Sequence, residues 1–174
     1  MKTNIRHLIF GLLFIVGPAA RAEVSTVVAW GSNAAGRTDV PAGLTNLVAI
    51  AAGQLHSLAL RDDGTVAAWG WPTNSTAELA NTVAISACAN RILALRADGS
   101  VKTWGTVWDG NGNSKATVPA GLTNVLAVAP GFGHTLALRA DGTVATWGYN
   151  GSGQTNVPPG LANVVAVAGG FGHS

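Results

Sequence analysis

The chain has 174 residues, of which 48% are hydrophobic and only 10% charged, with 23 glycines and one cysteine. Its formal net charge is +2, but Lys2, Arg6 and Arg21 lie in the first 22 positions, so residues 23–174 carry seven basic and eight acidic residues. Nucleic-acid binding needs a basic surface that neutralises phosphates, so this balance excludes a nucleic-acid partner. The single cysteine, Cys88, cannot form an internal disulfide, and we expect it to be a small buried side chain.

The first segment in chain order has the form of a secretory signal peptide. A basic start is followed by the apolar run 8–16 and by the small-x-small sequence 20–22. The apolar run is too short for a membrane span. The sequence therefore predicts a cleaved signal peptide over residues 1–22 and a mature chain with no transmembrane span. It also predicts export, so that the protein is secreted, periplasmic or on the cell surface.

The remaining residues, 23–174, repeat with a period of about 40 residues. Trp-Gly pairs mark the period at spacings of 39, 35 and 43 residues, and they are Trp30-Gly31, Trp69-Gly70, Trp104-Gly105 and Trp147-Gly148. In each unit an alanine-rich apolar segment is followed by an L-A-L-R segment, an Asp-Gly pair and the segment that ends in Trp-Gly. The Asp-Gly pair predicts a two-residue hairpin turn, because glycine tolerates the positive φ that such a turn needs.

We interpret each unit as four short strands. The first strands are expected over 47–50, 83–85, 125–128 and 164–167; the second strands end at Arg61, Arg96 and Arg139; the third strands are expected over 65–70, 100–105 and 143–148; the fourth end at the Val-Pro pairs 40–41, 118–119 and 157–158. Repeated four-stranded units of this length are typical of propeller blades. The predicted fold is all-β: a β-propeller of four-stranded antiparallel blades, here a partial, roughly half propeller of three full blades plus incomplete ends.

The motifs of these units resemble a known family. GQLHSLAL (53–60) and GFGHTLAL (131–138), with WGSNAAGR (30–37) and WGYNGSGQ (147–154), are similar to the regulator of chromosome condensation (RCC1) repeat. The linker Val-Pro-x-Gly-Leu-x-Asn-Val resembles the exported bacterial branch of this family, which includes β-lactamase inhibitory protein II. Family members typically close as about seven blades. The resemblance therefore implies that residues 23–174 are a fragment of a longer chain and form an open arc.

Strand alternation places the loops on two opposite faces. The G-x-x-H and W-G-x-N loops open on one face, and the Asp-Gly turns and the PAGLTN-type links open on the other. The first face carries aromatic residues and an arginine, which are typical anchors of protein interfaces. The arginine stands where neighbouring units have histidine. The candidate protein-binding residues are Gln54, Leu55, Trp71, Asn90, Arg91, Trp108, Asp109, Phe132, Tyr149, Asn150 and Phe171.

The histidines and acids form no catalytic or metal-binding pattern. His56, His134 and His173 occupy the same position of the repeat, at spacings of 78 and 39 residues, and we expect their ring nitrogens to bond backbone groups at strand starts. No Asp, Glu or Cys stands near them at metal-ligand spacing. Four of the eight acids belong to the Asp-Gly turns, away from the aromatic loops, so a pair of catalytic carboxylates is not expected. The sequence predicts no catalytic residue, no metal and no cofactor.

These patterns together predict an exported, non-catalytic propeller module that binds an unidentified extracellular or periplasmic protein through one face. Two alternatives stay open. Trp71, Trp108 and Tyr149 could stack on the sugar rings of a cell-surface polysaccharide. The chain could also be the propeller part of a larger enzyme or surface protein.

Overall fold

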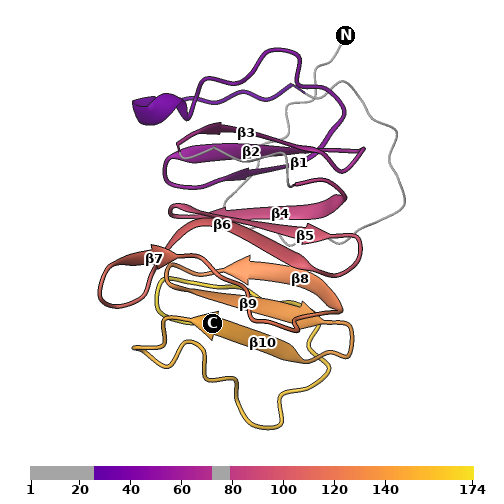
Figure 1. Cartoon of the computed structure of the whole chain (residues 1–174), viewed down its shortest axis with the longest axis vertical. Coiled ribbons are helices and arrows are strands. Elements are labelled where there is room, and N and C mark those ends of the chain that lie inside the picture. Colours follow the sequence, from indigo (N-terminus) through magenta and orange to yellow (C-terminus); the bar gives the residue numbers. More distant parts are fainter. Residues whose placement is uncertain (1–25, 72–78) are drawn as a thin grey trace.

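The computed structural model describes residues 26–71 and 79–174, so the predicted signal peptide lies outside the described residues. It contains three antiparallel sheets that stack on one another (Figure 1). The first sheet comprises β1 (Leu47–Ala52), β2 (His56–Arg61) and β3 (Val66–Gly70). The second comprises β4 (Thr82–Cys88), β5 (Arg91–Arg96), β6 (Val101–Trp108) and β7 (Asn113–Lys115), and the third comprises β8 (Val125–Pro130), β9 (His134–Arg139) and β10 (Val144–Gly148). A short 3-10 helix, η1 (Ala34–Gly36), precedes them, and no helix of the described part is long and apolar enough to cross a membrane.

The all-β propeller fold is confirmed, but the prediction of four strands in every unit is wrong for the third sheet, and the segment after β3 in the first sheet lies partly outside the described residues. Within residues 26–71 and 79–174, the sheet β4-β5-β6-β7 alone has a fourth strand, and it ends at Lys115, before the predicted Val-Pro pair. In the third sheet the segment before Val157 approaches β10 through a side chain, because the Thr146 hydroxyl donates to the carbonyl of Thr155 at 2.7 Å. Proline then removes the next backbone donor, so no ladder develops there.

The inner strand of each sheet begins with the same irregularity. The pairing register shifts between Leu47 and Ala49 in β1, and equivalent shifts occur at the starts of β4 and β8. Such a shift marks a β-bulge, which leaves one residue out of the ladder. The residues at these positions are exposed apolar side chains: Val48, Val83 and Leu126.

The Asp-Gly turns are hairpin turns, as predicted, but they span three residues rather than two. In the first sheet the Arg61 amide donates to the Thr65 carbonyl at 2.9 Å, and the Gly64 amide donates to the Arg61 carbonyl at 3.1 Å. Gly64 has a positive φ of 79° and Asp63 does not, which fits a type I turn followed by a glycine bulge. The Asp63 carboxylate selects this geometry by accepting bonds from the amide and hydroxyl of Thr65.

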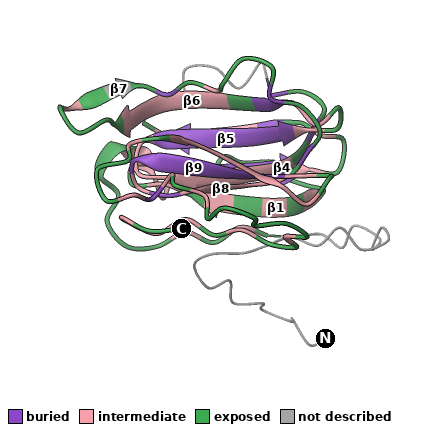
Figure 2. Cartoon of the chain, turned by 90° about the horizontal axis from the view of Figure 1, so that it is seen from below, coloured by how far each residue is buried: buried purple, intermediate pink, exposed green. Residues whose placement is uncertain are grey.

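The middle strands form the core between sheets. β2, β5 and β9 are the most buried strands, as Figure 2 shows for β5 and β9. In β5, Ile92 and Ala94 pack in a cluster with Leu58 of the first sheet, whereas Leu93 and Leu95 pack in a second cluster with Ala137 of the third. Alternate residues of one strand therefore contact different neighbouring sheets.

The tryptophans of the Trp-Gly pairs pack between blades. Trp104 and Trp147 each pack against one of these clusters. The indole Nε1 of Trp69 donates to the Arg37 carbonyl at 3.0 Å, and that of Trp147 donates to the Thr117 carbonyl at 2.9 Å. Trp30 belongs to the first end of the stack and is exposed.

Backbone bonds of one recurring type join successive sheets. The amide of Thr82 donates to the Gly64 carbonyl at 3.1 Å, and the amide of Val125 donates to the Gly99 carbonyl at 3.2 Å. Each bond ties the start of an inner strand to the Asp-Gly turn of the preceding sheet. The prediction of an inner strand over 164–167 is wrong, because neither this segment nor 27–30 belongs to a strand. The segment 27–30 lies at the end of the stack that is remote from β10 (Figure 1). The described residues form the predicted open arc.

Candidate functional site

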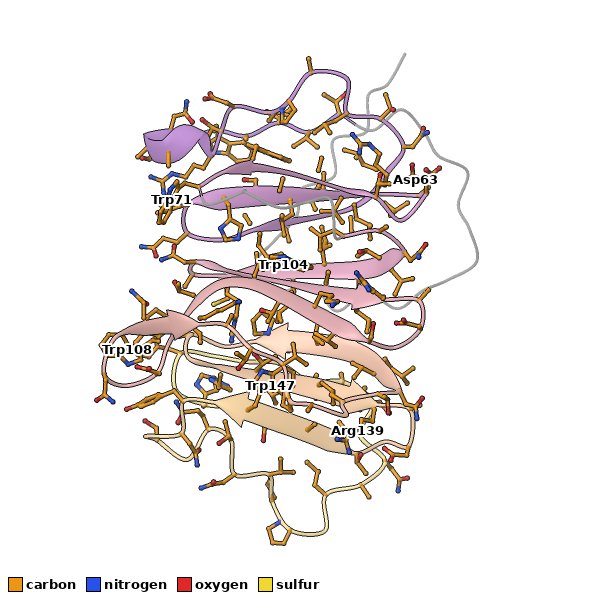
Figure 3. All side chains as sticks on the ribbon, in the orientation of Figure 1. Asp63, Trp71, Trp104, Trp108, Arg139 and Trp147 are labelled. Atoms are coloured by element: carbon orange, nitrogen blue, oxygen red, sulfur yellow. The ribbon has the colours of Figure 1, made fainter. Side chains whose placement is uncertain are left out.

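The two loop faces lie where strand alternation places them. Trp71 and Trp108 lie along one side of the stack, and Asp63 and Arg139 lie along the opposite side (Figure 3). We call the first side the aromatic face, comprising Gln54, Leu55, Trp71, Asn90, Trp108, Asp109, Phe132, Tyr149, Asn150 and Phe171. We call the second the Asp-Gly face, comprising the turns at Asp63, Asp98 and Asp141 with the strand ends at Arg61, Arg96 and Arg139. Most charges of the three sheets therefore gather on the Asp-Gly face.

Each Asp-Gly turn uses its aspartate locally. In all three turns the carboxylate accepts a hydroxyl and an amide hydrogen bond from the residue two positions later, which is Thr65, Ser100 or Thr143. These bonds, with the hydroxyl contribution largest, lower the pKa of each aspartate. The acids of this face thus stabilise turns.

The first part of the aromatic face joins the first and second sheets. Gln54 and Trp71 are exposed, and Leu55 is half-buried. The Trp71 amide donates to the Leu55 carbonyl at 2.8 Å, and the Gln54 amide donates to the Ala89 carbonyl at 2.7 Å. Asn90 is half-buried, and its carbonyl accepts from the Thr106 amide at 3.2 Å. Backbone bonds therefore fix the loops that carry these side chains.

The hairpin of β6 and β7 extends the aromatic face, because it projects past the ends of the neighbouring sheets (Figure 1). Trp108 ends β6 and is exposed. Asp109 Oδ1 accepts from the amides of Asn111 at 2.9 Å and Gly112 at 3.0 Å. The carboxylate thus helps to close the hairpin tip.

Tyr149 links this hairpin to the third sheet. A Cβ at Gly110 would lie 2.7 Å from the Tyr149 ring, and a Cβ at Gly133 would lie 3.0 Å from Tyr149 Cβ and 2.8 Å from the Trp108 carbonyl oxygen. Any larger residue at Gly110 or Gly133 would displace the ring or the hairpin. The Tyr149 amide also donates to the Gly133 carbonyl at 2.7 Å. The two glycines therefore allow Trp108 and Tyr149 to share one surface.

Phe132 and Phe171 form a stacked pair beside this surface. Their ring centroids lie 4.5 Å apart with an interplanar angle of 22°, which is a favourable offset arrangement. The Phe132 amide donates to the Gly170 carbonyl at 3.1 Å. Phe132 is half-buried, whereas Phe171 is 74% exposed. Phe132 therefore supports an aromatic side chain that faces solvent.

Two predicted binding residues have internal roles. Arg91 is only 3% exposed, so it is not a surface anchor; its Nη2 donates to the carbonyls of Gly131 at 2.9 Å and His134 at 2.7 Å. Asn150 is exposed, but its Nδ2 donates to Asn156 Oδ1 at 2.8 Å and its Oδ1 accepts from the Thr155 amide at 2.8 Å. Because both ends of its amide are used, Asn150 stabilises its own loop.

The rings of His56 and His134 interact with backbone groups of the next unit, as predicted, but without well-aligned hydrogen bonds to them. His56 is buried, and within the described residues neither of its ring nitrogens has a hydrogen-bond partner. Burial lowers the pKa of His56, and the nearby backbone of Arg91 partly offsets this effect. His134 is also buried with a lowered pKa, chiefly through desolvation, and its Nε2 lies 3.1 Å from Ser174 Oγ. No cluster of three or more His, Cys, Asp or Glu side chains that could hold a metal occurs in the described part.

Sequence reasoning missed one residue that supports the aromatic face. Arg37 Nη1 donates to the Gln54 carbonyl at 2.7 Å, and its Nη2 donates to Ser32 Oγ at 3.1 Å. Its own carbonyl accepts from Ser57 Oγ and from the Trp69 indole. The sequence offered one sign of this role: Arg37 ends the motif WGSNAAGR at the position that Gln154 occupies in WGYNGSGQ. The Gln154 carbonyl accepts from Ser174 Oγ at 2.6 Å.

Stacked antiparallel sheets with inner, buried middle and outer strands define a segment of a β-propeller. Residues 47–75 and 125–154 match the Regulator of chromosome condensation (RCC1) repeat. Two of the repeat units therefore match the RCC1 repeat, and the resemblance in the sequence is confirmed for these two segments. No match was found among curated proteins.

Three solved structures illustrate the fold. Prp20p from Saccharomyces cerevisiae is 21% identical with a TM-score of 0.57, and the match covers 72% of this chain and 40% of Prp20p. Human WBSCR16 is 24% identical with a TM-score of 0.53, covering 77% of this chain and 45% of that one. The CRINKLY WD40 ectodomain of the Arabidopsis thaliana receptor kinase ACR4 is 22% identical with a TM-score of 0.51, covering 72% and 43%. The chain spans less than half the length of each, and at these identities the likeness shows the fold.

Proposed function

We propose that this chain is an exported, non-catalytic propeller module that binds another protein through its aromatic face. The observation that carries the proposal is the separation of the two faces. Trp71, Trp108 and Phe171 are exposed on one face, whereas the acids and arginines of the three turns lie on the other. An exposed aromatic surface with few charges is typical of the centre of a protein interface.

The aromatic residues can bind at a low entropic cost because much of the face is already ordered. Phe132 is stacked under Phe171, and Tyr149 is held against Gly110. Side chains that are rigid before association lose less freedom when a partner docks. Each buried aromatic side chain removes about 150–250 Å² from water, so two or three of them are enough to anchor a complex.

Relatives of the same fold give precedent for this class of function. Prp20p has been characterised for its binding to Gsp1p and histones, and in another structure Kap60 is bound to yeast RCC1 (Prp20). Gsp1p, histones and Kap60 are partners of Prp20 and are not assigned to this chain. For this chain the signal-peptide sequence supports an extracellular or periplasmic protein partner, and the linker sequence supports the exported bacterial branch of the family.

The non-catalytic part of the proposal rests on the chemistry of the side chains. The aspartates of the turns accept local hydrogen bonds, and Asp109 closes its own hairpin. The buried histidines have lowered pKa values and face no carboxylate in the contacts described above. These acids and bases are therefore occupied in turns or in the interior.

The test compares capture of a protein from extracellular or periplasmic extract by the wild-type chain and by single variants. Trp108→Ala and Phe171→Ala should each weaken capture of the same partner by about tenfold or more, as expected for aromatic hot spots. Leu161→Ala is the matched control, because Leu161 is an exposed apolar side chain in a link of the opposite face. Equal capture by all four proteins contradicts the proposal, as does specific binding to a glycan array without any protein captured.

A further inference from the structure

Arg91 is an arginine buried at the junction between the second and third sheets. It is the first residue of β5, and its guanidinium reaches the third sheet, where Nη2 donates to the carbonyls of Gly131 and His134. Burial lowers the pKa of its guanidinium. A buried charge is costly unless hydrogen bonds compensate it, and here both acceptors come from a single loop of the next sheet.

The two acceptor carbonyls lie at the two ends of the loop that carries Phe132. The amide of Gly131 donates to the carbonyl of His134 at 2.9 Å, so this same carbonyl closes the loop and receives the arginine. Between these residues, the Phe132 amide donates to Gly170 and its ring stacks on Phe171. Arg91 therefore holds the base of the loop that supports the most exposed aromatic anchor of the aromatic face.

The equivalent positions at the other junctions carry histidine, and no hydrogen bond described for either histidine joins it to two carbonyls of the next unit, as Arg91 is joined. Among the described residues, the ring nitrogens of His56 form no well-aligned hydrogen bond and only interact with the backbone of Arg91, whereas the His134 ring contacts the hydroxyl of Ser174 and the backbone of His173. Their lowered pKa values keep both rings largely neutral at neutral pH. At the junction that supports the Phe132 loop, the donor is charged and reaches two carbonyls. Hydrogen bonds from charged donors are stronger than those from neutral donors.

We propose that Arg91 is a positioning residue of the aromatic face: it fixes the loop 131–134 so that Phe132 presents Phe171 as a rigid anchor. The contacts of Arg91 with Gly131 and His134 support the fixing of the loop. The effect on binding rests on the proposed function, so the order of the loop and the capture of the partner are measured separately.

Hydrogen–deuterium exchange of peptides covering residues 129–136 measures the loop directly. Arg91→Met removes the donors and keeps a long apolar side chain, and it should speed exchange of the Gly131 and Phe132 amides by about tenfold or more. Arg91→Lys, which keeps a cationic donor, should restore part of the protection. Arg91→His, the residue of the neighbouring units, replaces Arg91→Met if that variant fails to fold.

Leu58→Ala is the matched control for a general loss of stability, because Leu58 is fully buried in the first sheet, away from this loop. It should speed exchange in the first sheet and leave the loop 131–134 no more affected than the rest of the chain. Unchanged exchange of the loop in Arg91→Met, or an increase no larger than in the remainder of the chain, overturns the proposal.

Capture of the protein partner gives the second reading. Arg91→Met should weaken capture by about the factor seen for Phe171→Ala, and Arg91→Lys should recover part of it. Faster loop exchange with unchanged capture by both Arg91→Met and Phe171→Ala supports the loop-fixing role of Arg91 and contradicts the proposed function instead.

Discussion

Leu93 tests whether β5 is packed on both faces by neighbouring sheets. Its side chain is 1% exposed and packs in a cluster with Leu122, Val125 and Ala137, which belong to the third sheet or to the link before it. Leu93→Ala removes three carbon groups, each worth about 0.8 kcal/mol on transfer from water. The remaining cavity adds a further penalty, so the free energy of unfolding should fall by about 3 kcal/mol.

Urea denaturation followed by tryptophan fluorescence measures this loss, since Trp147 packs against the same cluster. The matched control is Leu161→Ala, where the side chain is 45% exposed and the loss should stay below about 1 kcal/mol. A loss for Leu93→Ala that is no larger than for Leu161→Ala would refute the packing of β5 between two sheets.

Two further predictions concern pH and backbone conformation. Burial lowers the pKa of His56 and His134 from 6.5, so the unfolded state binds more protons than the native state below that pH. The free energy of unfolding should therefore fall as pH decreases from about 7 to 5. His56→Gln should make this fall smaller in urea titrations. A free energy of unfolding that increases as pH decreases from about 7 to 5 would contradict the lowered pKa of these two histidines. Gly99 has a φ of +75°, and a Cβ there would lie 3.3 Å from Asn124 Cα; Gly99→Ala should cost about 1–2 kcal/mol in the same assay, whereas a neutral effect would show that the turn can change its conformation.

The sequence was most informative where the repeat is strict. The period and the Trp-Gly pairs predicted the stacked sheets, and the position of the second strands was correct to within a residue or two, as in β9. The two loop faces followed from strand alternation alone. Trp69 and Trp147, which mark the period in the sequence, are buried or packed against a core cluster in the structure.

The remaining errors concern contacts that periodicity cannot show. The Asp63 carboxylate bonds Thr65 in a three-residue turn, and the Asp-Gly pair in the sequence does not reveal that bond. Arg91 was predicted to be a surface anchor because arginine is a typical anchor of protein interfaces, whereas in the structure it is buried and bonds two carbonyls supplied by the next unit. The predicted fourth strand of the third sheet does not form, and there the Thr146 hydroxyl bonds the Thr155 carbonyl in place of a backbone ladder.

Oxidative footprinting of the chain with and without its captured partner tests the central claim most directly. In the free chain Trp108 and Phe171 should react readily, because both are exposed, and the buried Trp69 should react slowly. Binding of the partner should protect Trp108 and Phe171 and leave Leu161 on the opposite face unchanged. Protection of Leu161 and the Asp-Gly turns, with Trp108 and Phe171 still reactive, would contradict binding through the aromatic face.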